Sequence, residues 1–281
     1  MKKIIATLSV LSLMLSAGTV FAAPNLAPHN LNTPGTSRTL LLPEAADRSP
    51  VISLGQAVDP VSGAVVEGIA FIHYKDNFGN GNSNGRSNES RGGRGGSACY
   101  AFLANGAKWK NTEDYMFDAT NGRGLNEATL HSFLSQSVET WDGEVAANVF
   151  GVEVAGTVDG ADTSSPDGKN EILFGNVSSQ GAIAITIVWG TFYGPPSQRQ
   201  LVEWDMIFDD TDFDWSAEAL GVAGKMDFHN IAAHEVGHAA GMGHPESSCV
   251  NETMYAYADN AEIKKRDLNS GDIAGIKALY K

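Results

Sequence analysis

The sequence is poor in cysteine and in basic residues. Its 281 residues include only two cysteines, which excludes a small scaffold held together by several disulfides. Only 19 lysines and arginines stand against 33 acidic residues, so the net charge is −14. Because such a chain repels phosphate groups and has no basic stripe, nucleic acid and anionic membranes are excluded as partners.

Long apolar runs are also missing beyond the first 22 residues, so we expect no stable membrane insertion and a soluble monomer. The N-terminus has a basic start at Lys2 and Lys3, an apolar stretch over residues 4–15 and small residues up to Ala22. This pattern is typical of a secretory signal peptide over residues 1–22. The sequence therefore predicts a secreted, extracellular protein, with a periplasmic location as the alternative.

Residues 234–244 read His-Glu-Val-Gly-His-Ala-Ala-Gly-Met-Gly-His and contain three histidines at close spacing. His234 and His238 are four residues apart, so on a helix they share one face and can bind one ion. His244 is the third candidate ligand. Three neutral imidazoles leave one tetrahedral position open, which is typical of a catalytic zinc site rather than a structural one. Imidazole also suits other transition metals.

Two more residues complete the pattern. Glu235 follows the first ligand and is placed to reach a water on the metal rather than the metal itself. Gly241 tolerates the left-handed conformation that commonly follows a helix end, so the chain can turn and bring the third histidine round. Ordinary polar histidines rarely reproduce this extended spacing by chance.

The pattern H-E-x-x-H-x-x-G-x-x-H resembles the signature of the metzincin metallopeptidases. Met254, in Glu-Thr-Met-Tyr, fits the methionine-bearing turn of that family. The Met-Tyr pair is most similar to the matrixin branch, the family of the matrix metalloproteinases, in a secreted bacterial type. Ala256 stands where matrixins usually have proline, which puts the shape of the specificity pocket in question.

The resemblance implies a secreted zinc endopeptidase that hydrolyses peptide bonds in proteins, with zinc-activated water and Glu235 as general base. Met254 would form an apolar floor under the ligands. The substrate would lie extended along a sheet edge, for which residues 182–189 are the candidate. The alternatives are an exported zinc-containing binding or adhesion protein, and a peptidase limited to self-processing.

The expected fold class is α+β: a metzincin-type catalytic domain with a twisted mixed sheet, a long packing helix, the zinc helix, the methionine turn and a C-terminal helix. Apolar periodicity favours a helix from Leu130 to Trp141. Asp227 and Ser270 are the expected N-caps of the zinc helix and the last helix. Strands are expected over residues 65–74, 113–118, 172–174, 182–189 and 202–208.

The composition changes along the chain suggest a zymogen. Residues 23–77 are interpreted as a pro-segment, and residues 78–98 as a Gly/Asn/Arg-rich flexible linker that would contain the cleavage point. The catalytic domain is expected over residues 99–281. The alternative is that residues 23–77 remain permanently attached through a spacer.

The two cysteines, Cys99 and Cys249, are expected to form a disulfide, which is the default in an exported protein. The alternative is a latency switch in which a pro-segment thiolate occupies the open zinc position. Matrixins that use such a switch have Pro-Arg-Cys-Gly, whereas Cys99 follows Ser97-Ala98.

Acidic and glycine-rich stretches are candidates for structural calcium, which prefers oxygen ligands. The first contains Asp159, Asp162 and Asp167, and the run 209–214 is similar. Asp and Gly also form ordinary turns, so both interpretations stay open. Four other histidines have no partner at metal-ligand spacing and are expected to be ordinary core or surface residues: His29, His73, His131 and His229.

Overall fold

The computed structural model describes residues 38–42, 49–76 and 98–281. They belong to one compact unit, Gly35–Lys281. The predicted signal peptide, nearly all of the predicted linker and the first part of the predicted pro-segment lie outside the described residues.

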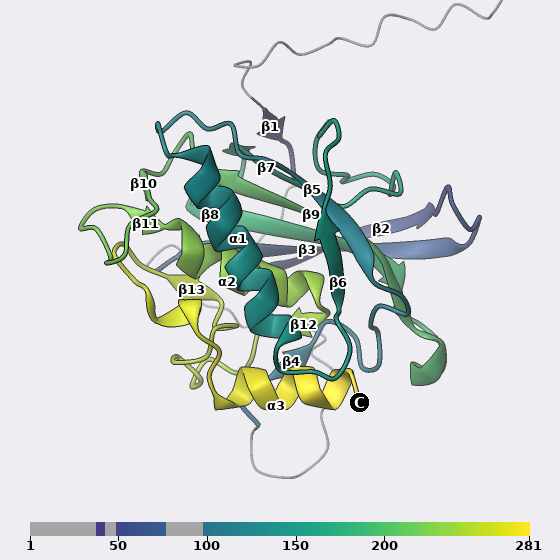
Figure 1. The fold of residues 1–281 in the computed structure, drawn as a ribbon. Helices are drawn as coiled ribbons and strands as arrows, with labels where there is room; N and C mark the ends of the chain where they lie inside the picture. The colour runs from purple at the N-terminus through teal and green to yellow at the C-terminus, as the bar shows by residue number, and fades with distance from the viewer. Residues whose placement is uncertain (1–37, 43–48, 77–97) are drawn as a thin grey trace, which may run out of the picture. The chain divides into compact units, whose positions relative to one another are not determined.

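A nine-stranded mixed sheet forms the centre of this unit (Figure 1). Its main path runs in the order β6, β5, β7, β9, β8, β3 and β13, while β1 pairs with β7 and β2 pairs with β3. The bounds are β1 Thr39–Leu40, β2 Val51–Val58, β3 Val65–Lys75, β5 Glu113–Asp118, β6 Phe150–Glu153, β7 Glu171–Val177, β8 Ala182–Thr191, β9 Gln200–Asp209 and β13 Tyr257–Ala258.

The strand directions divide the sheet into two parts. Strands β6, β5, β7 and β9 are parallel to one another, whereas β8 is antiparallel to β9 and β3 is antiparallel to β8. Nine of the ten residues of β8 are buried, which fits its nearly continuous apolar sequence and its position between two strands. All five predicted strands are present.

Part of the predicted pro-segment belongs to this sheet. Strands β2 and β3 form an antiparallel hairpin, and β3 pairs with β8 from Glu67 to Tyr74. In the hairpin turn, Asp59 accepts a hydrogen bond from the backbone N–H of Val61 at 3.0 Å, and Gly63 has a φ of +71°. Strand β3, which the sequence analysis assigned to a separate pro-segment, is therefore part of the main sheet. Whether residues 23–77 are removed stays a prediction.

Three helices have the expected order: α1 Glu127–Asp142, α2 Phe228–Ala239 and α3 Ser270–Leu279. Asp227 caps α2 as predicted, since its carboxylate accepts the Asn230 N–H at 2.9 Å. The predicted cap of α3 is wrong by one residue. Asn269, not Ser270, is the N-cap, because the Asp272 carboxylate accepts the Asn269 N–H in a capping box.

Helices α1 and α2 pack together against one face of the sheet (Figure 1). Trp141 of α1 is fully buried and donates a hydrogen bond from Nε1 to the Ala233 carbonyl of α2 at 2.8 Å. On the opposite face a second apolar cluster includes Leu40, Ile72 and Trp189. The α+β fold expected for a metzincin catalytic domain is thus observed.

Short elements complete the unit: β4 Ala101–Phe102, η1 Pro196–Gln198, β10 Trp215–Ser216, β11 Met226–Asp227, β12 Met242–Gly243 and η2 Lys264–Arg266. A disulfide joins Cys99 and Cys249, which are 150 residues apart in the sequence. It ties the segment before β4 to the loop that follows the predicted third ligand. Within the described residues, no helix has the length and apolarity that a membrane span requires.

Candidate active site

Helix α2 positions two of the three candidate ligands, and its end lets the chain turn toward the third. The helix stops at Ala239, and Gly241 follows with a φ of +93°, a conformation that favours glycine. A Cβ at Gly241 would also lie 2.9 Å from the Ala107 carbonyl oxygen. The short strand β12 then pairs with β4 and leads directly to His244.

The three histidines point their Nε2 atoms at one place. The Nε2–Nε2 distances are 3.1 Å between His234 and His238, 3.0 Å between His238 and His244, and 3.3 Å between His244 and His234. Zinc–nitrogen bonds of about 2.0–2.1 Å in tetrahedral geometry place ligand nitrogens about 3.4 Å apart. The spacing of the three nitrogens fits a single zinc ion.

The other ring nitrogens favour the same arrangement. His234 Nδ1 donates to the Thr253 carbonyl at 2.6 Å and His238 Nδ1 to the Met242 carbonyl at 2.9 Å, which leaves both Nε2 lone pairs for a metal. His244 Nδ1 is buried without a partner among the described residues. Burial lowers the pKa of His238 to about 3 and holds the pKa of the other two well below its usual range. The imidazoles are therefore neutral, as metal ligands must be.

Met254 is fully buried against α2, as the methionine turn requires. A Cβ at Gly237 would lie 2.2 Å from Met254 Sδ and 2.6 Å from Trp141 Cζ2. Only glycine therefore allows the methionine to approach the helix at this point. The turn is held from below, because the Asp272 carboxylate accepts the backbone N–H groups of Thr253 at 2.7 Å and Met254 at 3.2 Å.

Glu235 is fully buried beside the three nitrogens. Its Oε2 accepts a hydrogen bond from Thr186 Oγ1 of β8 at 2.6 Å, and its Oε1 lies 3.1 Å from His73 Nδ1. Burial raises the pKa of Glu235 to about 8, although the Thr186 hydrogen bond opposes this shift. A carboxyl group with a pKa near neutrality is suited to taking up and giving back a proton.

Sequence reasoning missed two residues at this site, His73 and Lys265. His73 Nε2 lies 2.9 Å from Lys265 Nζ, and the His73 ring packs against the His234 ring with centroids 3.8 Å apart. Burial lowers the pKa of Lys265 to about 7. Metal-ligand spacing along the sequence gave no signal for either residue. The alternation of Phe71 and His73 on one face of β3 was the available clue.

Strand β3 covers the site. The Phe71 ring stacks on the His238 ring with centroids 4.1 Å apart, and the relative exposure of the three ligands is 0%, 1% and 8%. Residues 182–189, the predicted substrate edge, lie in β8, whose Thr186 bonds to Glu235, but β8 is not a free edge in this structure. Its edge is paired with β3 along most of its length.

The three aspartates predicted to bind calcium are not brought into one group. Asp159 and Asp167 lie with Glu171 around the ammonium of Lys169, at 2.8, 2.6 and 3.7 Å respectively. This lysine already supplies a positive charge to that group. Asp162 does not belong to that group, although Asp167 and Asp159 lie near enough to raise its pKa.

Asp162 instead shares a group with Glu203 and Asp205 of β9, whose carboxylate oxygens lie within 4.8 Å of one another. Glu203 Oε1 is buried without a hydrogen-bond partner among the described residues. Burial raises the pKa of Asp162 to about 6 and of Glu203 to about 8, and holds the pKa of Asp205 well above its usual range. In the run 209–214, the Asp209 carboxylate accepts backbone N–H groups of its own turn.

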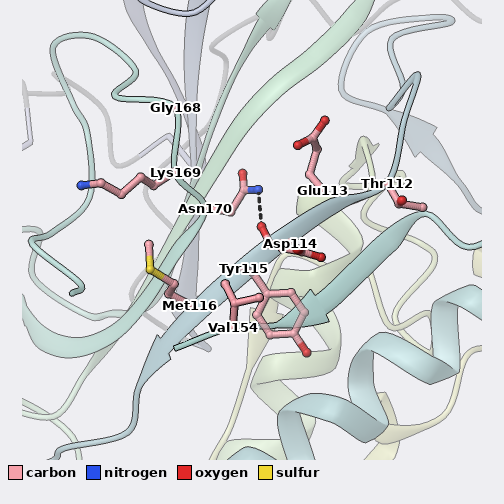
Figure 2. A pocket seen from close by; sticks show the side chains of 9 residues that line it. All are labelled: Thr112, Glu113, Asp114, Tyr115, Met116, Val154, Gly168, Lys169 and Asn170. Atoms are coloured by element: carbon pink, nitrogen blue, oxygen red, sulfur yellow. Dashed lines mark hydrogen bonds between the residues drawn. The ribbon is translucent and has the colours of Figure 1, made fainter. Parts of the chain in front are cut away.

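A pocket away from the metal centre is lined by residues 112–116 and 168–170 together with Val154 (Figure 2). None of the residues of the metal centre lines it. Asn170 Nδ2 donates to the Asp114 carbonyl at 2.8 Å, and Asn170 Oδ1 accepts the Trp204 N–H at 3.0 Å. Asn170 therefore joins neighbouring strands, which is a structural role.

These residues define a metzincin-type metal centre. It consists of three histidines on and after one helix, a glutamate beside them and a methionine beneath, all under a mixed sheet. Residues 161–281 match the Matrixin family model. The chain is 28% identical to Matrilysin of Homo sapiens over 192 residues, which are 65% of this chain and 62% of Matrilysin. The comparisons therefore support a matrixin-like metzincin, from a family of zinc metalloendopeptidases.

Two plant proteins match over shorter stretches. Metalloendoproteinase 4-MMP of Arabidopsis thaliana is 36% identical over 69 residues, which are 25% of this chain and 18% of the relative. Metalloendoproteinase 2-MMP of the same plant is 34% identical over 76 residues, 25% of this chain and 19% of the relative. The matches thus span less than two thirds of the length of each of these relatives.

Proposed function

We propose that the protein is a secreted zinc endopeptidase that hydrolyses peptide bonds in proteins. The observation that carries the proposal is the set of three convergent Nε2 atoms, 3.0–3.3 Å apart, with Glu235 buried beside them. A structural zinc site would close the fourth position with another protein ligand. Here Glu235 is held instead by Thr186 and His73, as a neighbour of the metal.

The residues would divide the chemistry between them. A zinc ion held by His234, His238 and His244 would supply the Lewis acid that lowers the pKa of water and polarises the scissile carbonyl. Glu235 takes the proton from the attacking water and delivers it to the leaving amine. Thr186 holds one carboxylate oxygen, and the other oxygen, which faces His73 in this structure, would face the reacting atoms once His73 has left.

The test is digestion of a mixed peptide library by the purified, processed protein, with Glu235→Ala as the matched control. Cleavage by the wild type and none by the variant is the expected result. A zinc-loaded, processed protein that cleaves nothing in the library or in a panel of whole proteins would favour the alternative, an exported zinc-containing binding protein. Cleavage of its own linker alone would favour a self-processing peptidase.

We further propose that residues 23–77 are a pro-segment whose strand β3 keeps the enzyme latent. The support is the position of β3: it occupies the edge of β8, and its side chains lie on the ligands and on Glu235. No substrate backbone reaches Glu235 while this strand is present. N-terminal sequencing of the active protein tests this, since fully active protein that retains β3 would contradict latency.

Export and calcium binding belong to the same proposal. The signal peptide expected over residues 1–22 directs the protein out of the cell, where calcium is plentiful. For calcium, the group Asp162, Glu203 and Asp205 replaces the predicted trio, because Glu203 and Asp205 are buried and Glu203 Oε1 has no hydrogen-bond partner among the described residues. Isothermal titration of the zinc-loaded protein with calcium, beside Glu203→Gln, tests the site, and equal binding by both would reject it.

A further inference from the structure

Strand β3 lies in the structure as a bound peptide would lie. It runs antiparallel to β8, with His73 opposite Ala184, and its end runs parallel to β13, with Tyr74 opposite Tyr257. Peptides commonly bind by adding a strand to a sheet edge, and alternate side chains then enter pockets. The contacts of β3 therefore indicate which side chains the groove between β8 and β13 accepts.

His73 is the β3 side chain that enters the space beside the ligands. It is fully buried, its Nδ1 lies 3.1 Å from Glu235 Oε1, and its ring centroid lies 3.8 Å from that of His234. Its Nε2 lies 2.9 Å from Lys265 Nζ. A substrate side chain in this position would directly flank the bond on which Glu235 acts.

Lys265 is held so that its ammonium faces this space. Its backbone N–H donates to Asn230 Oδ1 of α2 at 2.7 Å, and its ammonium donates to the Tyr255 carbonyl and to His73. The side chain is fully buried. Among the described residues no carboxylate forms an ion pair with this ammonium, although Glu262, Glu235 and Asp76 are near enough to raise its pKa. A buried ammonium without a carboxylate partner is unfavourable, so the space beside it favours a negative group.

We propose that Lys265 is a specificity-determining residue that favours polypeptides with Asp or Glu directly beside the cleaved bond. The inference rests on the proposed peptidase function. When β3 leaves, the ammonium loses His73 as an acceptor. A substrate carboxylate in that place accepts a charge-assisted hydrogen bond, whereas an apolar side chain leaves the ammonium with the Tyr255 carbonyl alone and a lysine repels it.

The test uses the processed protein, purified with zinc, and peptides with the sequence of Glu67–Asp76. In these peptides His73 is replaced by Glu, Gln, Leu or Lys. For each peptide kcat and KM are measured with the wild type, Lys265→Met and Lys265→Glu, and the cut is located by mass spectrometry. Circular dichroism establishes that each variant is folded.

The wild type is expected to cleave the Glu peptide with a kcat/KM about 10- to 100-fold above that of the Leu peptide, the usual effect of a hydrogen bond to a charged group. Lys265→Met should reverse this order, and Lys265→Glu should favour the Lys peptide. A merely structural lysine would lower all four rates alike. If the variants do not fold, the wild-type order alone decides.

Two results would overturn the inference: an unchanged order of peptides in the folded variants, or a wild type that prefers the Leu peptide. Either result would leave the peptidase function standing. If neither these peptides nor a mixed library is cleaved, the proposed function fails, and the inference fails with it.

Discussion

Replacing Phe71 by alanine in the intact chain should activate it before any processing. Phe71 is buried against the His238 ring, and release of β3 exposes it. A buried Phe→Ala change removes about 3–5 kcal/mol of packing. The variant loses this packing only while β3 is bound, because Phe71 is exposed once β3 is released. A loss of about 3 kcal/mol raises the fraction of molecules with β3 released about 100-fold.

The assay is the initial rate of cleavage of a fluorogenic peptide by the unprocessed, zinc-loaded chain, with gel electrophoresis to establish that it is still intact. Val65→Ala is the matched control, because Val65 lies in the same strand and is 45% exposed. The variant rate should exceed the control rate about 100-fold. Equal rates, with both proteins folded, would refute the view that β3 blocks the site.

Three further predictions concern stability. Gly237→Ala should lower the free energy of unfolding by about 1–3 kcal/mol, because the added Cβ would lie 2.2 Å from Met254 Sδ; chemical denaturation measures this, and an unchanged midpoint would contradict it. Burial raises the pKa of Glu203 from 4.5 to about 8. Without calcium, Glu203 therefore loses its proton at a lower pH in the unfolded chain than in the folded protein, and the stability measured by calorimetry should fall as the pH rises from 4.5 to about 8. Glu203→Gln should flatten that fall, and a wild-type profile in the variant would contradict the assignment. Reducing the Cys99–Cys249 disulfide opens a loop of 150 residues and should remove about 5 kcal/mol, seen as a lower melting temperature with dithiothreitol.

The fold was predictable where a local sequence pattern determines the secondary structure. Helix α1 follows from apolar spacing, and α2 begins at Asp227 because a carboxylate there satisfies a free backbone N–H. For α3 the same reasoning placed the cap at Ser270, one residue too late, since serine and asparagine both cap helices well. The choice depends on the return hydrogen bond to Asp272, which a single residue type does not reveal.

The candidate site was predictable only where its residues are close in the sequence. His234 and His238 are one helical turn apart, so their spacing alone predicts a shared ion. His73 lies 162 residues before Glu235 and reaches it through the pairing of β3 with β8. Strand pairing between distant segments is set by the whole fold, so the strand was predicted from its composition but its partner was not.

The most direct test of the central claim is to measure zinc content and peptide cleavage in the same samples of wild type, Glu235→Gln and His238→Ala. The expected result is one zinc per chain in the wild type and in Glu235→Gln, with cleavage by the wild type alone. His238→Ala should lose both zinc and cleavage. Cleavage by zinc-loaded Glu235→Gln at the wild-type rate, or full zinc content in His238→Ala, would contradict the assignment of these histidines as ligands and Glu235 as the base.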